Sequence, residues 1–275
     1  MTEIWWSRPS SDPVELRALL ERDRGYAAYA LGDLAPGFRE YSRWYVAGRG
    51  TAPEALILLF ERLDPPALFC FGPGAGVATA IRRASLPARV YFTGLMEHAM
   101  AVAGLFHFRT WVPMWRMTIS EADFRPAGAG RVRRLRMDDL PALRRLYVYG
   151  GGDAFAPYQL EQGVFFGCWD GENLVAVAGT HLVASEPGVA AIGNVFTHPD
   201  HRRRGFGAAV TSAVTAELLH RGMTVVLNVA QRNAPAIALY RRLGYRCHCP
   251  FVEGIADLNP PQRLSEEISQ TGECT

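Results

Sequence analysis

The run from Asn194 to Ala208 carries the residue types best suited to binding a charged ligand. Three consecutive arginines at 202–204 precede glycines at 205 and 207. The apolar spacing beyond Gly205 predicts a helix that ends near Arg221. The unpaired N–H groups of a helix start favour an anion, and glycine lets a phosphate approach the backbone closely. The sequence therefore predicts a phosphate-binding turn with arginine side chains at its rim.

A second chemically competent group follows after one predicted strand. Asn233 is a good N-cap for a helix that ends at Gly244, and Tyr240 lies seven residues beyond it. Seven residues are nearly two helical turns, so the two side chains project toward a similar side. A tyrosine hydroxyl can protonate a leaving group; the alternative is a core tyrosine with a satisfied hydroxyl.

Together these stretches resemble the GNAT superfamily of acyl-CoA-dependent N-acyltransferases. The matching sequence motifs are V-F-T-x-P at 195–199, R-x-x-G-x-G at 202–207 and N-x-P-A-I-A-L-Y-x-x-L-G-Y at 233–245. They lie within a region from about Val132 to Val252. The stretch LNVAQRNAPAIALYRRLGY is particularly similar to the branch that includes glycine N-acyltransferase-like enzymes. In that branch a degenerate GNAT-like half precedes the catalytic one.

The resemblance implies acetyl-CoA as cosubstrate. It places pantetheine against the strand that ends at Thr197, where this strand splays from the strand 223–230. It implies that Tyr240 protonates the departing thiolate, while we expect Phe206 to be a core anchor that offers only its backbone. The cofactor-binding residues implied in this way, with the arginines at the rim, are Val195, Phe196, Thr197, Arg202, Arg203, Arg204, Gly205, Phe206, Gly207, Ala208 and Asn233.

The general base departs from the family pattern. Many members place a glutamate on the strand before the turn, where this chain has Ala191, and no carboxylate occurs from Val189 to Pro199. His181 is a candidate, because a hairpin would bring it near Ile192 to within about one residue. The alternatives are a histidine that is merely hydrogen-bonded, or removal of the proton by solvent. His198 and Glu253 are weaker candidates.

Three further polar features have more than one interpretation. Asp153, after three glycines, could attract a cationic amine or simply cap a helix. Asn228, in an apolar strand, needs a hydrogen-bond partner in the backbone or in a ligand. Cys247 and Cys249 are expected on one side of a strand, with no second Cys or His cluster at zinc spacing, so we predict no metal site.

The elements that position these residues form two halves. We predict a degenerate GNAT-like domain at 1–122, a linker at 123–130, a catalytic GNAT domain at 131–258 and a tail at 259–275. The second half reads as an α/β mixed sheet, and the first half repeats its order loosely, which suggests a duplicated fold; an unrelated α/β cap is the alternative. Strands are expected at 131–135, 164–169, 173–184, 189–197, 223–230 and 245–253, and helices at 137–148, 157–163, 205–221 and 233–244. We expect CoA to bind only in the second half.

The amino-acid composition limits the classes of molecule that the protein is expected to bind. The 275 residues contain no lysine, 29 arginines and 27 acids, and a net charge of +2 gives no general attraction to nucleic acid or to a membrane. Five cysteines favour reduced thiols, and with no apolar leader we expect a cytoplasmic protein. The sequence thus predicts an N-acetyltransferase for a small-molecule amine or peptide, and a homodimer is possible. The alternative is a CoA-binding sensor or assembly module without catalysis.

Overall fold

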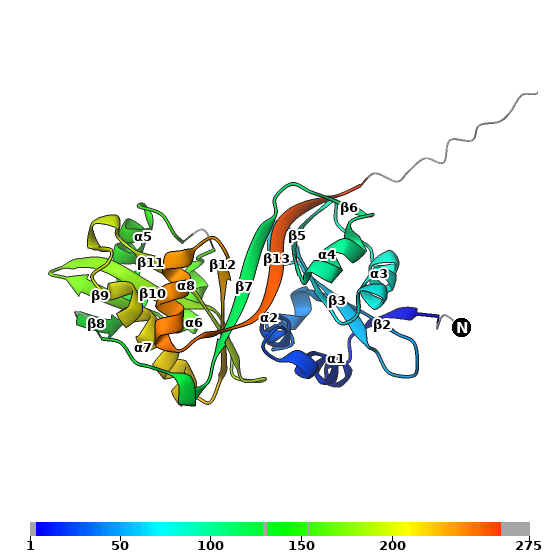
Figure 1. Cartoon of the computed structure of the whole chain (residues 1–275), viewed down its shortest axis with the longest axis horizontal. Coiled ribbons are helices and arrows are strands. Elements are labelled where there is room, and N and C mark those ends of the chain that lie inside the picture. Colours follow the sequence, from blue (N-terminus) through cyan, green and yellow to red (C-terminus); the bar gives the residue numbers. More distant parts are fainter. Residues whose placement is uncertain (1–3, 129–130, 153, 260–275) are drawn as a thin grey trace, which may run out of the picture.

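A single mixed sheet of thirteen strands runs through the whole molecule, with helices on both of its faces (Figure 1). The computed structural model describes residues 4–128, 131–152 and 154–259. Residues 129, 130 and 153 and the predicted tail from Pro260 onward, with Cys274, therefore lie outside the described residues. In the part of the chain that is described, no helix is long and apolar enough to cross a membrane.

The first half begins with an edge strand and ends with a long aromatic strand. Its elements are β1 (Trp6–Ser10), α1 (Pro13–Leu20), α2 (Ala28–Gly32), β2 (Ser42–Gly48), β3 (Ala55–Phe60), β4 (Ala67–Phe71), α3 (Gly74–Arg83), β5 (Arg89–Gly94), α4 (Met96–Val102), β6 (Phe106–Phe108) and β7 (Val112–Ile119).

The second half repeats this order of elements. It contains β8 (Arg131–Arg134), α5 (Leu140–Tyr147), α6 (Pro157–Gln162), β9 (Phe166–Asp170), β10 (Asn173–Ala184), β11 (Val189–Thr197), α7 (Phe206–His220), β12 (Thr224–Ala230), α8 (Ala234–Leu243) and β13 (Arg246–Leu258). In each half the fourth and fifth strands pair in parallel, β4 with β5 and β11 with β12, whereas the earlier strands pair antiparallel. The architecture is therefore a duplicated α/β fold, as the sequence predicted.

The two halves exchange their last strands. The strand order is β1-β2-β3-β4-β5-β13-β7-β12-β11-β10-β9-β8, so β13 of the second half pairs with β5, and β7 of the first half pairs with β12. β7 and β13 also pair with each other and cross the middle of the molecule (Figure 1). Each half therefore completes its sheet with a strand from the other.

Most element positions agree with the sequence expectations, and the differences have physical causes. β10 and β11 have the expected bounds. The aromatic run 107–119, which the sequence predicts as one strand, is two strands, because the N–H groups of Arg109 and Thr110 donate to the carbonyl of Ile255. β13 continues past residue 253 to Leu258, since β5 and β6 supply it with long-range partners. β1 was not expected, because it is short and contains Pro9.

The expectation that Cys247 and Cys249 share one side of a strand is wrong. A register shift in β13 places Cys247 opposite Met117 and Cys249 opposite Arg116 of β7, so His248 is an extra residue between them. Cys249 packs against the core on the α2 face, whereas Cys247 is exposed beside Arg241 of α8. The described residues contain no cluster of His, Cys, Asp or Glu suited to a metal.

The core is divided by the sheet. On one face, α7 and α8 pack against alternate residues of β11 and β12, including Ile192 and Leu227. On the other face, α1 and α2 of the first half cover Ala191 and Val226, next to α5 and α6 on β10. Both halves therefore contribute helices to the face opposite α7 and α8.

Candidate functional site

β11 and β12 pair with each other over only about half of their length. Their parallel pairing extends from Val189 and Thr224 to Ile192 and Leu227 and then stops. β11 continues to Thr197 along β10, while β12 continues to Ala230 along β7. The wedge that the family resemblance implied between these strands is therefore present, and it opens beyond Ile192.

Asn194 shapes the wall of this wedge and was missed in the sequence. Its φ of 54° is left-handed, and it lies in an irregular stretch where β11 shifts register against β10. Asparagine tolerates this conformation better than most residues. Its Nδ2 donates to Oε1 of Gln159 at 3.2 Å, and its carbonyl accepts from the Tyr147 hydroxyl at 3.0 Å. The only available sequence signal was an asparagine following Gly193 in an apolar strand.

The predicted anion-binding turn has the geometry of an open helix start. Arg203 and Gly205 have left-handed φ angles of 61° and 83°, and no side chain of the described residues caps α7. The N–H groups from Phe206 to Ala208 likewise have no acceptor in the described ranges, the first helical bond being that of Ala209 to Gly205. A Cβ at Gly207 would lie 3.1 Å from Oγ1 of Thr197. These features fit a diphosphate.

The three arginines at the rim differ in their surroundings. Arg202 donates from Nε to the Thr197 carbonyl at 3.3 Å. Arg204 lies 3.8 Å from a carboxylate oxygen of Asp170, with its guanidinium over the Phe206 ring. Arg203 is exposed and has no hydrogen bond or ion pair with any described residue. Phe206 is buried in the core, as predicted.

Tyr240 belongs to the core cluster that α7 and α8 form with the sheet. Its side chain is 7% exposed, its ring lies 6.0 Å from that of Tyr245, and its hydroxyl has no hydrogen-bond partner among residues 4–128, 131–152 and 154–259. Burial raises the pKa of Tyr240 to about 12, so the hydroxyl keeps its proton at neutral pH. Asn233 caps α8, its Oδ1 accepting from the N–H of Ala236 at 3.2 Å.

His181 occupies the predicted place in the hairpin. It is the extra residue between the pairs Thr180–Ile192 and Leu182–Ala191. Its Nδ1 lies 3.2 Å from the hydroxyl of Tyr29 in α2, and burial lowers its pKa, so the ring is neutral at pH 7. Asp153, the candidate acceptor-binding residue, lies outside the described residues.

Asn228 has its partner in β13 rather than in the backbone. Its Nδ2 donates to Oε1 of Glu253 at 3.1 Å, while its own Oδ1 is buried without a partner. Burial raises the pKa of Glu253, and the neighbouring Tyr91, Arg116 and Asn228 oppose that shift. A carboxylate therefore lies near the opening of the wedge, although none is present in β11.

Comparisons with known proteins show which family the chain belongs to. Residues 167–251 match the model of the FR47-like protein family. A [ribosomal protein bS18]-alanine N-acetyltransferase of Escherichia coli K12 is 33% identical over 138 residues, which are 46% of this chain and 91% of that protein. A GCN5-related N-acetyltransferase from Kribbella flavida has a similar structure, with a TM-score of 0.60 at 20% identity, covering 85% of this chain and 96% of that one. The chain belongs to the GNAT family of acetyltransferases.

The tandem arrangement also has a counterpart within the GNAT family. A tandem GNAT protein from the clavulanic acid biosynthesis pathway covers 94% of this chain and 99% of its own, with a TM-score of 0.54 at 14% identity. GNAT acetyltransferases take their acetyl group from acetyl-CoA, so this chain is an acyl-CoA-dependent N-acetyltransferase.

The corresponding helix start in the first half of this GNAT chain is occupied by a side chain. The N–H of Gly74, at the start of α3, donates to a carboxylate oxygen of Glu97 at 3.3 Å. Gly76 packs against Trp5 and Ala55. The carboxylate of Glu97 therefore lies at the α3 start, where it would repel an anion.

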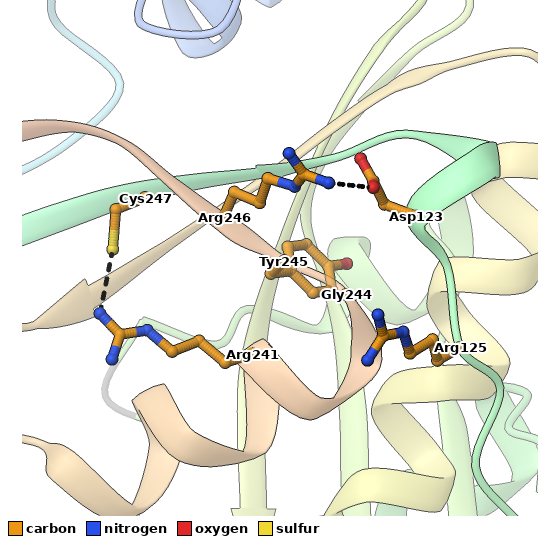
Figure 2. Close-up of a pocket in the computed structure, with 7 residues that line it drawn as sticks. All are labelled: Asp123, Arg125, Arg241, Gly244, Tyr245, Arg246 and Cys247. Atoms are coloured by element: carbon orange, nitrogen blue, oxygen red, sulfur yellow. Dashed lines mark hydrogen bonds and ion pairs between the residues drawn. The ribbon is translucent and has the colours of Figure 1, made fainter.

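A separate pocket lies at the far end of α8 (Figure 2). It has a volume of about 350 Å³ and contains no residue of the GNAT motifs around 195–208. Arg246 forms an ion pair with Asp123 there, and Arg241 points to Cys247 (Figure 2). The arginines are exposed, and this pocket is not part of the candidate site.

Proposed function

We propose that this protein transfers the acetyl group of acetyl-CoA to a primary amine by direct attack, without a covalent enzyme intermediate. The observation that carries the proposal is the start of α7, where free N–H groups and left-handed Gly205 lie beside the opening of the wedge. Free N–H groups at a helix start bind a diphosphate by hydrogen bonds and by the helix dipole. The wedge would then receive the pantetheine arm.

The cofactor would be held by residues of one continuous segment and by α8. In this proposal Val195, Phe196 and Thr197 offer backbone groups to pantetheine. The turn from Arg202 to Ala208 holds the diphosphate, with Arg203 as its most available charge. Asn233 would lie close to the cofactor in addition to its role as the cap of α8.

Tyr240 would serve as the general acid. The amine attacks the thioester carbonyl carbon, the carbon–sulfur bond breaks, and the thiolate takes the hydroxyl proton of Tyr240. The free hydroxyl and a pKa of about 12 suit this role, because the proton is present at neutral pH and can be donated to sulfur as charge develops there.

The acceptor is an ammonium at neutral pH, so it must give a proton to an acceptor before its amine can attack. His181 is neutral at pH 7 and lies on the α2 face of the sheet, where it is engaged with Tyr29. Glu253 is a carboxylate near the wedge opening, where it contacts Asn228. We propose His181 as the general base and Glu253 as the alternative. Replacing the residue that serves as the base should shift the acidic limb of the pH profile of kcat/KM.

The proposal also concerns the class of amine that accepts the acetyl group. The relative from Escherichia coli is named for the alanine of a ribosomal protein, so an α-amine is a reasonable acceptor class here. The similarity of residues 227–245 to the glycine N-acyltransferase-like branch supports a small amine in place of a polypeptide.

The proposed function is tested by release of free CoA thiol. The purified chain is incubated with acetyl-CoA and a panel of amino acids, polyamines, aminoglycosides and peptides. Amine-dependent thiol release, with an acetylated product of matching mass, is the expected result. Stoichiometric binding of acetyl-CoA with no thiol release for any acceptor would instead identify a binding module and overturn the proposal.

A further inference from the structure

Arg116 is a buried charge without a counter-ion. It lies in β7, its side chain is 2% exposed, and no carboxylate of the described residues is within ion-pair distance of it. Two of its guanidinium nitrogens, Nε and Nη1, are buried without a hydrogen-bond partner. Its guanidinium lies over the rings of Tyr29 and Phe251, at 4.9 and 5.1 Å. Aromatic faces stabilise a cation but do not accept these N–H hydrogens as a carboxylate would.

Asn228, directly opposite Arg116, lacks a hydrogen-bond donor where Arg116 lacks acceptors. Its Oδ1 is a buried acceptor without a donor, while its Nδ2 is bound to Glu253. Arg116 and Glu253 are close enough for the guanidinium to lower the carboxyl pKa, yet they are not paired with each other. Buried polar groups almost always have hydrogen-bond partners. Three buried atoms without a partner in one cluster, Nε and Nη1 of Arg116 and Oδ1 of Asn228, therefore indicate a ligand site.

The cluster lies where the acetyl group would be delivered. Asn228 follows Leu227, which forms the last rung between β11 and β12, and it faces the side of the sheet covered by α2. Figure 1 shows α2 beside β7 and β13, where the two halves meet. Tyr29 of α2 connects Arg116 to His181, and a cavity of about 30 Å³ opens beside His181 between α6 and Phe38.

We infer that the acceptor is a small amine that also carries a carboxylate, with the carboxylate bound to Arg116 and the amine placed beside the Asn228–Glu253 pair, where it can donate to Oδ1 of Asn228 and to the Glu253 carboxylate. This inference rests on the proposed acetyl transfer and specifies its substrate class. A zwitterion supplies an anion for the unpaired N–H groups, and N–H donors for Oδ1 of Asn228 and for the Glu253 carboxylate.

A purely structural role explains the cluster less well. Withdrawing a guanidinium from water is costly unless ionic partners and hydrogen bonds replace the water. Other arginines at the junction of the halves have such partners: Arg24 donates to the Thr224 hydroxyl at 2.8 Å and to the carbonyl of Gly188 at 3.0 Å. A polypeptide N-terminus would bring an amide, not a carboxylate, to Arg116, so a free small molecule suits the site better.

The test compares acceptors in matched sets on the full chain with saturating acetyl-CoA. Each set contains a free amino acid, its carboxamide and its decarboxylated amine, for example phenylalanine, phenylalaninamide and phenethylamine, together with a peptide that begins with the same residue. For the preferred set, kcat/KM of the carboxylate member should exceed that of its amide by about a hundredfold, because a buried cation is left unpaired by the amide.

Arg116 variants separate this binding role from a structural one. Arg116→Met should reduce the carboxylate-to-amide ratio of kcat/KM toward one while leaving KM for acetyl-CoA unchanged, and Arg116→Lys should retain part of the ratio. Arg246→Met is the matched control, since Arg246 is exposed on the neighbouring strand β13 and belongs to the distant pocket (Figure 2). Its ratio should equal that of the unaltered chain.

Each result decides between the inference and its alternatives. Equal acetylation of amino acid and amide, or preference for the peptide, would overturn the carboxylate inference and leave the acetyltransferase proposal standing. An undiminished ratio in Arg116→Met would likewise overturn it. If Arg116→Met does not fold, the ratio in the unaltered chain and in Arg116→Lys still decides. Failure of every acceptor to cause thiol release would overturn the proposed function itself.

Discussion

Arg116 of the first half faces Asn228 of the second half across the β7–β12 pair, one step beyond the last rung that joins β11 to β12. The exchanged strand therefore carries a charge from the first half to the opening of the second half's wedge. The first half therefore does more than bury one face of the second half. It supplies a wall of the candidate acceptor site, through Arg116 and through Tyr29.

This relationship predicts an unusual stability effect. Arg116→Met should unfold at the same temperature as the unaltered chain or at a higher one, because methionine keeps the contact with Phe251 and removes an unpartnered buried charge. Arg24→Met, which removes several hydrogen bonds between the halves, should unfold earlier by roughly 2–4 °C per kcal/mol lost. Thermal unfolding without ligand checks both. A large fall for Arg116→Met would mean that the guanidinium is structural.

The helix start is tested by paired glycine variants at the two ends of α7. Gly205→Ala forces a left-handed φ of 83° on a residue with a Cβ and should weaken acetyl-CoA binding about tenfold or more. Gly222→Ala imposes a similar strain at φ 69° at the other end, where a Cβ meets no atom within 4 Å. Both should lose about 1 kcal/mol of stability, but only Gly205→Ala should change the calorimetric Kd for acetyl-CoA. Equal Kd values would remove the turn from the cofactor site.

Tyr240→Phe isolates the acid role, because it removes one oxygen from a buried ring. We expect kcat to fall about a hundredfold while the Kd for acetyl-CoA changes little. With a pKa of about 12, Tyr240 should cause no loss of activity between pH 7 and about pH 10 in the unaltered chain. Single-turnover rates at saturating substrate give the measurement. An unchanged chemical rate in Tyr240→Phe would show that another group, or water, protonates sulfur.

Local patterns in the sequence predicted the wedge strands and the glycine turn, since both depend on residues close together in the chain. Helical spacing after Gly205, the cap at Asn233 and the stop at Gly244 need no distant partner. The acceptor side could not be predicted in this way. Arg116, Asn228 and Glu253 meet only because β7 and β13 cross between the halves, and their separate strands show no common spacing. The bulge that separates Cys247 from Cys249 has the same origin.

Asp33 predicts a pH dependence of stability. Burial raises its pKa to about 8, above the value of an unfolded aspartate. The folded chain therefore holds a proton that the unfolded chain releases, so this contribution to stability is full below about pH 4 and is lost progressively as the pH rises to about 8. Asp33→Asn should remove the loss and raise the unfolding temperature at pH 9 relative to the unaltered chain, with a much smaller difference at about pH 4. A difference of the same size at both pH values would exclude this titration.

The strand exchange makes a prediction about separated halves. A fragment of residues 1–128 lacks β13, and a fragment of residues 131–275 lacks β7, so each leaves long strand edges unpaired. Exposed edges of this kind promote aggregation, and we expect neither fragment to be soluble and folded alone. Co-expression should restore the pairs of β7 with β12 and of β5 with β13, and with them acetyl-CoA binding. Circular dichroism and size-exclusion chromatography of each fragment and of the mixture provide the measurement. A second fragment that folds and binds acetyl-CoA by itself would show that β7 is dispensable for the site.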